Sequence, residues 1–308
     1  MKKYYLFIAV FNFAYNSITN AQFIPKIPFE LCNNRLIIEH TLKGLNKDMC
    51  FDTGSNINII NTTTNSFPNY TSNKNFATMS LGVFDLNLIT IDNIKDSLFG
   101  DIWAGYERSI SLKSDCNIDG ILNGSLLFNK FVIEINFINK HINILSDSVL
   151  FLSLKHNIKS TFQLDHPAKD YETLASKFIS NFISISGLIQ FQDSSHVKTQ
   201  FLIDTGSNYE IALVVSDSSL IKKYSLGKVL YENDFFNVEK EIDYTYVSYN
   251  IGDNTKSQHI KTLMFFSEPS LFSIFGSRKI GVLLGVPFFI KYNSLVIDYF
   301  DKKLYLYN

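Results

Sequence analysis

Glycine and proline are scarce in this sequence, with 14 and 6 among 308 residues, which excludes a collagen-like chain. Charged residues make up only 19% while aromatic residues reach 15%, so the composition also excludes a disordered chain. Neither sign of charge predominates, because 28 Lys and Arg stand against 29 Asp and Glu. This balance gives no electrostatic reason to expect nucleic acid or an anionic membrane as a partner.

Several motifs of common enzyme and cofactor classes are missing. The cysteines form no C-x-x-C pair, the six histidines lack the spacing of a metal site, and no Gly-x-Ser-x-Gly marks a nucleophile elbow. We therefore expect no metal and no cofactor. Cys32, Cys50 and Cys116 are an odd number. A local disulfide between Cys32 and Cys50 is one alternative, but we favour three small buried apolar residues.

The first 21 residues have the layout of a secretory signal peptide. Lys2 and Lys3 give a positive start, residues 4–15 are apolar apart from Asn12, and small residues lead to Ala21. The apolar run is shorter than the roughly 20 residues that cross a bilayer, and no later uncharged stretch reaches that length. We therefore expect cleavage after residue 21, a periplasmic or secreted protein, and no membrane association afterwards.

The chain contains a long-period duplication. Residues 49–56 run from an apolar strand into Asp-Thr-Gly-Ser-Asn, and residues 201–208 do the same. Each copy follows a predicted hairpin, at residues 36–52 and 183–204. Each copy also ends alike, with segments 119–124, 131–136 and 139–144 in the first and 281–285, 295–299 and 301–306 in the second.

Strand patterns dominate both copies, as in residues 243–249 and 303–307, where β-branched or aromatic residues alternate with polar ones. One helix is predicted at residues 171–179, and residues 146–169 are interpreted as a linker. These features divide the mature chain into an N-terminal lobe, residues 22–155, and a C-terminal lobe, residues 156–308.

Each Asp-Thr-Gly-Ser lies where an apolar strand meets a turn that glycine permits, which would lift a carboxylate out of the sheet. Two similar lobes could bring Asp52 and Asp204 together about a pseudo-twofold axis. Two carboxylates at close range cannot both ionise, so they share one proton. The ionised group can then activate a water as general base, while the protonated group polarises a carbonyl. Aspartic proteases use a pair of this kind.

On these motifs the sequence resembles aspartic proteases of the pepsin and retropepsin superfamily, and most of all secreted bacterial retropepsin-like proteins. Residues 27–35, the hairpin, the Asp-Thr-Gly turn, a hydrophobic-hydrophobic-Gly element and two closing strands follow the family order. The resemblance covers nearly the whole mature chain, twice. It implies an all-β, two-lobed fold of β-barrels with internal duplication, complete in one chain and therefore a monomer.

The resemblance also assigns roles to single residues. Asp52 and Asp204 match the catalytic pair. The residues that match the supports of the active-site loops are the bracing threonines Thr53 and Thr205, the turn glycines Gly54 and Gly206, and Ser55 and Ser207 at the position that hydrogen-bonds the outer carboxylate oxygen. A hydroxyl donor there would lower the first pKa of the pair, which predicts an acidic optimum.

Two features depart from the family pattern. Residues 283–285 match the hydrophobic-hydrophobic-Gly element, but in the first copy Leu122 is followed by Asn123 and then Gly124. The glycine is there either displaced by one place or replaced by Asn. The hairpin expected to cover the cleft, near residues 78–92, contains no Tyr, so we assign no flap residue.

The resemblance implies an aspartic endopeptidase that hydrolyses an extended polypeptide through a water activated between the two aspartates. One alternative is a non-catalytic or latent secreted protein that binds a peptide or partner on the same fold. Another is an enzyme in which one lobe is only a scaffold. Geometry separates them, because an active enzyme needs the carboxyls of Asp52 and Asp204 within hydrogen-bond range, with Thr53 and Thr205 beneath.

Overall fold

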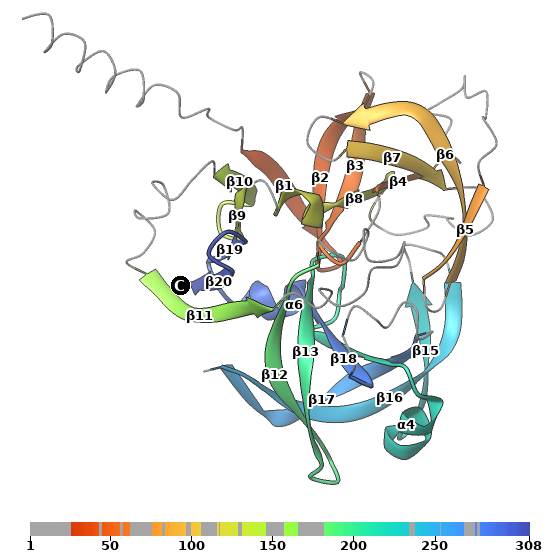
Figure 1. The fold of residues 1–308 in the computed structure, drawn as a ribbon, viewed down its shortest axis with the longest axis vertical. Helices are drawn as coiled ribbons and strands as arrows, with labels where there is room; N and C mark the ends of the chain where they lie inside the picture. The colour runs from red at the N-terminus through yellow and green to blue at the C-terminus, as the bar shows by residue number, and fades with distance from the viewer. Residues whose placement is uncertain are drawn as a thin grey trace, which may run out of the picture.

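The structure, a computed structural model, describes a chain of two β-rich lobes that share a sheet (Figure 1). The expected signal peptide, the helix predicted at residues 171–179 and the division at residue 155 lie outside the described residues. Those residues are 26–42, 45–55, 58–61, 76–81, 84–96, 100–105, 116, 118–128, 131–145, 157–165, 182–233, 238–252, 254–267, 275 and 278–308.

The first lobe is a sheet whose strands follow the order β1-β2-β3-β8-β4-β7-β6-β5. The β2–β3 hairpin is antiparallel, whereas β3 runs parallel to β8. Its elements are β1 (Ile27–Cys32), β2 (Arg35–Leu42), β3 (Leu45–Asp52), β4 (Asn58–Asn61), β5 (Phe76–Leu81), β6 (Phe84–Asp96), β7 (Gly100–Gly105), β8 (Gly120–Asn123), the 3₁₀ turn η1 (Gly124–Leu127), β9 (Val132–Asn136) and β10 (His141–Leu145).

The second lobe repeats this topology with the order β11-β12-β13-β18-β14-β17-β16-β15. A further pairing of β12 with β16 closes the sheet on itself. Its elements are β11 (Ile158–Asp165), β12 (Ser184–Phe191), β13 (His196–Asp204), β14 (Ile211–Val215), α4 (Ser218–Tyr224), β15 (Gly227–Asn233), β16 (Val238–Ile251), β17 (Asn254–Phe266), β18 (Ile280–Gly285), α6 (Val286–Phe289), β19 (Ser294–Asp298) and β20 (Lys303–Tyr307).

Apart from the pairing of β12 with β16, the described strands of the two lobes carry the same parallel and antiparallel pairings. In each lobe the strand that ends in the aspartate has a hairpin partner on one side and a parallel strand on the other, β8 beside β3 and β18 beside β13. The all-β, two-lobed fold expected from the duplication is therefore confirmed. The expected hairpins at residues 36–52 and 183–204 are confirmed with it.

A sheet shared by both lobes joins them. Its order is β1-β10-β9-β19-β20-β11, antiparallel throughout, so the described part of each lobe contributes three strands. The central pair, β9 and β19, is the seam, with Ile135 opposite Leu295. Figure 1 shows this sheet to one side of the two lobes.

The strand β11 corrects the interpretation of residues 146–169 as a linker, at least for Ile158–Asp165. Its side chains alternate between the core and solvent: Ser160, Phe162 and Leu164 are buried while their neighbours are more exposed. This period of two is a strand signal that the polar composition of the segment concealed.

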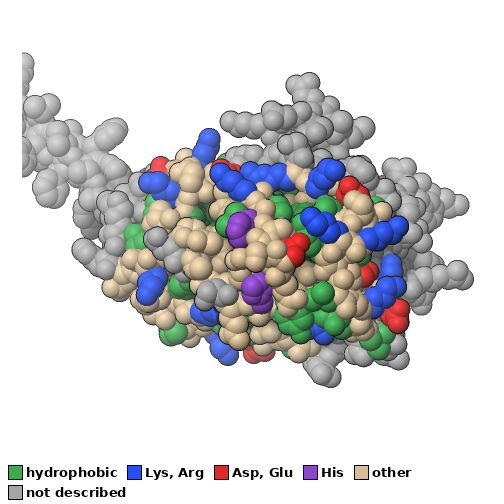
Figure 2. All heavy atoms as spheres, turned by 90° about the horizontal axis from the view of Figure 1, so that it is seen from below, with side chains coloured by type: hydrophobic (Ala, Val, Ile, Leu, Met, Phe, Trp, Pro, Cys, Tyr) green, Lys and Arg blue, Asp and Glu red, His purple; other side chains and the backbone are tan. Residues whose placement is uncertain are grey.

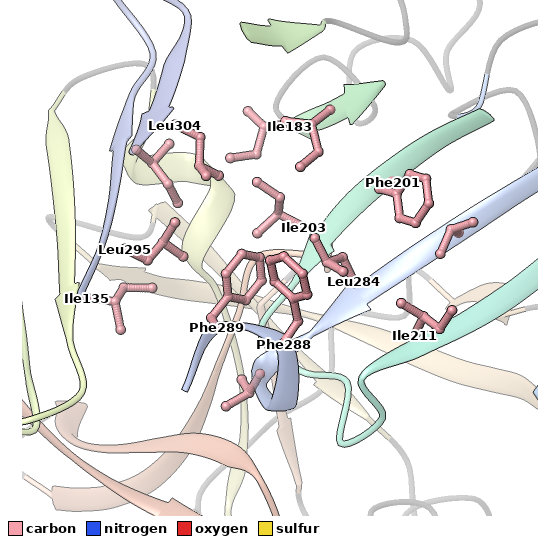
Figure 3. Packing of buried hydrophobic residues seen from close by; sticks show 14 of the residues in the cluster. Ile135, Ile183, Phe201, Ile203, Ile211, Leu284, Phe288, Phe289, Leu295 and Leu304 are labelled. Carbon is pink, nitrogen blue, oxygen red and sulfur yellow. The ribbon is translucent and has the colours of Figure 1, made fainter. Parts of the chain in front are cut away.

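The core is continuous from the second lobe into the shared sheet. In Figure 3, Phe288 and Phe289 of α6 point into the space between Ile203 and Leu284 on one side and Leu295 on the other. Phe289 is fully buried and Phe288 nearly so. Pro287 at the start of α6 favours the turn that sends both rings inward.

The surface carries charges of both signs. Figure 2 shows Lys and Arg side chains dispersed mainly along the edges of the lower face, with apolar areas between them. Among the described residues, no helix has both the length and the apolar character needed to cross a membrane.

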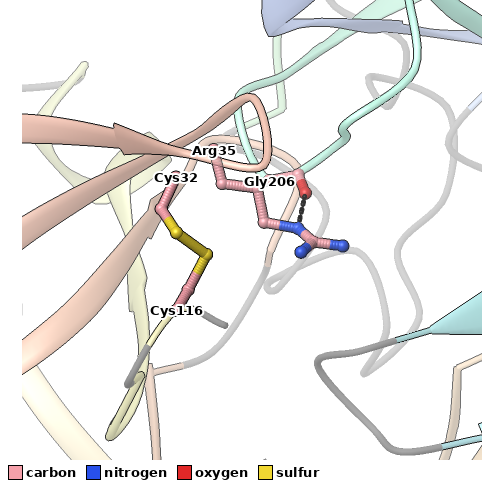
Figure 4. Close-up of a disulfide and its surroundings, with 4 residues drawn as sticks. All are labelled: Cys32, Arg35, Cys116 and Gly206. Carbon is pink, nitrogen blue, oxygen red and sulfur yellow. Dashed lines mark hydrogen bonds between the residues drawn. A yellow bond between two sulfur atoms is a disulfide. The ribbon is translucent and has the colours of Figure 1, made fainter. Parts of the chain in front are cut away.

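The cysteines differ from what the sequence suggested. Cys32, at the end of β1, is bonded to Cys116, 84 positions along the chain (Figure 4). Cys50 is a buried free thiol. The interpretation of all three as unbridged apolar residues is therefore wrong for Cys32 and Cys116. The alternative bond between Cys32 and Cys50 is also wrong, because Cys32 is bonded to Cys116 and Cys50 is a free thiol buried within β3.

The disulfide yields a prediction about stability and thiol content. Because it closes a long loop, replacing Cys32 and Cys116 together with Ala should lower the unfolding free energy by about 2–4 kcal/mol, measured by urea unfolding. The protein unfolded without reductant should titrate one thiol per chain, and three after reduction. Cys50→Ala is the control, since it should remove the free thiol without changing the response to reductant. Three titratable thiols before reduction would contradict the bond.

Candidate active site

The two sequence-predicted aspartates meet at the contact between the lobes. Asp52 is the last residue of β3 and Asp204 the last of β13, so each carboxyl projects from a strand held on both sides. Their carboxyl groups are hydrogen-bonded to one another. Both residues keep partial exposure to solvent, whereas Thr53 and Thr205 next to them are fully buried.

Each turn glycine packs against the carboxylate of the other lobe. A β-carbon placed on Gly54 would lie 2.5 Å from Cγ of Asp204, and one placed on Gly206 would overlap the carboxyl of Asp52. Only a residue without a side chain leaves room for this contact with the carboxyl of the opposite lobe. The glycines of the motif are therefore required by the closeness of the two carboxyls, and not only by the shape of each turn.

The two threonines brace the loops beneath the carboxyls. The Thr53 hydroxyl accepts from the Thr205 backbone N–H at 3.1 Å and donates to the carbonyl of Ile203 at 2.8 Å. The Thr205 hydroxyl makes the reciprocal bonds, from the Thr53 N–H at 3.0 Å and to the carbonyl of Phe51 at 2.7 Å. Each hydroxyl thus binds two backbone groups of the opposite lobe.

Backbone N–H groups of both turns point at the carboxylates. The Gly54 N–H donates to Oδ1 of Asp52 at 2.7 Å, and the Gly206 N–H donates to Oδ1 of Asp204 at 3.0 Å. The N–H groups of Ser55 and Ser207 add a bond to the carboxylate of their own lobe. The hydroxyl of Ser207 instead accepts from the Tyr209 N–H at 3.5 Å.

Burial governs the protonation of the pair. Burial and the neighbouring charge of Asp52 raise the pKa of Asp204 well above its ordinary value. Burial also raises the pKa of Asp52, against the hydrogen bonds from Asp204 and the turn N–H groups and against the charge of Arg35. This direction is opposite to the one predicted from the serine hydroxyls, because the cost of desolvation exceeds the gain from hydrogen bonds to the ionised form.

The first lobe departs from the second at the position after its hydrophobic pair. Asn123 lies opposite Asp52 in the β3–β8 pairing, and Gly285 lies opposite Asp204 in the β13–β18 pairing. The two residues therefore hold the same position, so the glycine of the first lobe is replaced by Asn and not displaced. The Asn123 N–H donates to Oδ1 of Asn58 at 2.7 Å, and its own Oδ1 accepts from the Ser125 N–H at 2.9 Å. Side-chain hydrogen bonds support the first loop.

Backbone contact supports the second loop instead. The Gly285 N–H donates to the carbonyl of Glu210 at 3.1 Å, and the Val286 N–H donates to the carbonyl of Ser207 at 3.3 Å. A β-carbon on Gly285 would lie 2.7 Å from that same Ser207 oxygen. Asparagine therefore fits the position in the first lobe and would be excluded from it in the second.

Sequence reasoning assigned no role to two residues beside the aspartates. Arg35, at the start of β2, is only 4% exposed, and its Nε donates to the carbonyl of Gly206 at 3.1 Å (Figure 4). Cys50, two positions before Asp52, is buried, and burial strongly raises the pKa of its thiol. The rarity of Arg is the one signal that could have indicated Arg35, since the chain contains 25 Lys and only three Arg.

The segment expected to cover the site forms a hairpin. Strands β5 and β6 are antiparallel, with Leu81 paired to Phe84 at the tip. In the part of the chain that the structure describes, no three His, Cys, Asp or Glu side chains cluster closely enough to hold a metal ion.

Comparisons with known proteins give a likeness of fold. No protein-family model matches the chain, and no curated protein matches it. Among solved structures, an aspartic proteinase from Irpex lacteus is similar over 92% of this chain and 97% of its own. Its sequence identity is 10% and the TM-score is 0.44, so this is a likeness of fold alone.

The threonine brace predicts a specific loss of stability. Thr53→Val keeps the shape of the side chain but leaves the Thr205 N–H and the Ile203 carbonyl buried without a partner. Each orphaned group costs about 1–3 kcal/mol, so the loss of both partners should lower the unfolding free energy by about 2–6 kcal/mol. Thr53→Ser keeps the hydroxyl and is the matched control. Equal losses for Val and Ser, in urea unfolding, would contradict the brace.

The raised pKa of Asp204 predicts that the pair destabilises the fold as pH rises. A carboxyl with a raised native pKa binds its proton more tightly in the folded state, so stability is lost between its unfolded pKa and its native pKa. Asp204→Asn removes that loss and should be more stable than wild type at pH 7, with the difference shrinking towards pH 4. Unfolding free energies at several pH values measure it, and Asp301→Asn, in an exposed turn, is the control. A difference independent of pH would refute the assignment.

Proposed function

We propose that the protein is an aspartic endopeptidase that hydrolyses peptide bonds with a water held between Asp52 and Asp204. The observation that carries this proposal is the pair of hydrogen-bonded carboxyls on two loops that brace one another through Thr53 and Thr205. Preorganised acid and base groups of this kind need no reorganisation when a substrate arrives.

The chemistry follows from one shared proton. The ionised carboxyl takes a proton from the water, whose oxygen attacks the carbonyl carbon, while the protonated carboxyl gives its proton to the carbonyl oxygen. When the resulting diol intermediate collapses, the carboxyl that took the proton from the water gives it to the amide nitrogen, a hydroxyl of the diol returns its proton to the other carboxylate, and the C–N bond breaks. The pair again holds one proton and the cycle closes. The turn N–H groups stabilise the ionised carboxyl throughout.

The raised pKa values place the working range of the proposed enzyme. Only the singly protonated pair has both a base and an acid, so activity should be lost where the pair gains a second proton or loses its last. The raised pKa of Asp204 extends to higher pH the range over which the pair keeps that last proton. The proposed optimum is therefore acidic, with a decline on the alkaline side as Asp204 ionises.

The remaining expectations join the same proposal. We infer an extended polypeptide substrate, a monomeric enzyme complete in one chain, and a place among secreted bacterial retropepsin-like proteins. The Cys32–Cys116 disulfide supports an oxidising compartment such as the periplasm or the cell exterior.

A peptide-cleavage assay tests the proposal. Wild type should cleave members of a diverse peptide mixture, read by mass spectrometry from acid to neutral pH. Asp52→Asn and Asp204→Asn should each lower kcat/KM by at least about 100-fold, because each removes one partner of the acid–base pair. Asp301→Asn, the same chemical change in an exposed turn, should cleave like wild type.

The other outcomes separate the alternatives. A folded wild type without cleavage at any pH would refute the endopeptidase and favour a peptide-binding or latent protein. Loss in only one of the two active-site variants would identify the other lobe as a scaffold. Loss in Asp301→Asn as well would attribute the effect to folding, and circular dichroism of each variant checks that.

A further inference from the structure

A buried arginine of the first lobe reaches into the active-site loop of the second. Arg35 donates from Nε to the carbonyl of Gly206, across 171 positions of sequence, and is 4% exposed (Figure 4). A buried guanidinium needs a compensating negative charge nearby. The singly ionised pair of Asp52 and Asp204 supplies one such charge.

The backbone that carries Arg35 is tightly fixed. Cys32 and Arg35 are the last pair of the β1–β2 ladder, and the two residues between them, Asn33 and Asn34, have φ of 48° and 59°. Two consecutive positive φ values are those of the tightest hairpin turn, and Asn is one of the few residues that adopt them readily. The disulfide from Cys32 to Cys116 anchors the same turn.

One peptide group links the hydrogen bond of Arg35 to the carboxylate of Asp204. The carbonyl of Gly206 and the N–H of Ser207 belong to the same peptide group, and that N–H donates to Asp204. A cation at the carbonyl end polarises the group and strengthens the hydrogen bond at its N–H end. The α-carbon of Gly206 meanwhile packs against the carboxyl of Asp52.

The arrangement is one-sided in spite of the duplication. In the first hairpin, Arg35 stands two places beyond the pair Ile37–Cys50 and therefore level with Asp52. In the second hairpin, the residue two places beyond the pair Ser184–Leu202 is Phe182, which is buried in an apolar cluster. The pair of aspartates thus receives this cation from the first lobe only.

Among the described residues, the charge of Arg35 from β2 acts on Asp52, and the thiol of Cys50 from β3 lies within the electrostatic reach of Asp52, Asp204 and Arg35. The charge of Arg35 lowers the pKa of Asp52 and that of the Cys50 thiol, against burial, which raises both. Because burial holds the Cys50 thiol neutral at working pH, Arg35 is the charged one of these two groups beside the pair.

We propose that Arg35 is a positioning residue that holds the Gly206–Ser207 peptide against Asp204 and sets the pH range in which the two aspartates share one proton. The inference rests on the proposed function for its catalytic meaning, but the ionisation of the carboxyls can be measured whether or not the protein cleaves peptides.

Two substitutions separate charge from hydrogen bonding. Arg35→Gln keeps a donor for the Gly206 carbonyl and removes the charge, so both limbs of the pH–rate profile should move up by about 1 pH unit. Arg35→Lys keeps the charge and should leave the limbs in place while lowering kcat, because its single ammonium replaces the planar fork. Lys47→Gln is the matched control: Lys47 is a buried cation on β3, paired with Asp119 at 3.8 Å, and its loss should leave the limbs unmoved.

A second readout does not depend on activity. In protein labelled with ¹³C at the aspartate carboxyls, the two active-site signals are those missing from Asp52→Asn and Asp204→Asn. Their titrations should move up by about 1 pH unit in Arg35→Gln and stay in place in Arg35→Lys. Unchanged titrations in Arg35→Gln would overturn the inference, as would equal shifts in both variants. Shifted titrations without peptide cleavage would overturn the proposed function and leave the role of Arg35 standing.

Discussion

The reciprocal hydrogen bonds of Thr53 and Thr205 are the constraint from which the rest of the site follows. Each hydroxyl is buried and is bonded to the backbone of the opposite lobe, so neither loop can shift without orphaning polar groups in the interior. With the loops locked, the two carboxyls stand too close for both to ionise. That enforced closeness has two consequences. Each turn glycine packs against the carboxyl of the other lobe, and the pKa of Asp204 is raised.

The duplication preserves topology and lets the supporting contacts diverge. Asn123 and Gly285 occupy the same register position beside their aspartates, yet one acts through side-chain hydrogen bonds and the other through close backbone approach. Arg35 and Phe182 also hold matching positions in the two lobes, but the first is a cation and the second an apolar ring. A symmetric scaffold therefore holds an asymmetric electrostatic environment, which is what two carboxyls with different tasks require.

Much of this architecture is readable from the sequence because its signals are local. The doubled Asp-Thr-Gly-Ser, the two hairpins and the closing strands are each encoded within about twenty neighbouring residues, by alternation, apolar runs and turn residues. The residues that support the two active-site loops could be named as well, since the resemblance assigns that role to the threonine and glycine that follow each aspartate.

Other features depend on long-range pairing, which no local pattern encodes. Cys32 and Cys116 are 84 positions apart in the sequence. They meet because the chain returns to the side of β3 through the parallel strand β8. Arg35 becomes part of the site only when the second lobe docks against the first. The strand β11 was hidden for a different reason, because its outward-facing residues are polar and gave the segment the composition of a linker.

The seam between β9 and β19 has a consequence for the two halves taken separately. A chain containing only the first half would leave one side of β9 as an open edge, a row of N–H and C=O groups ready to pair with any strand of matching shape. The most similar strand available to it would be β9 of an identical molecule. Carrying both halves in one chain keeps that edge permanently covered, and it makes assembly of the site independent of protein concentration.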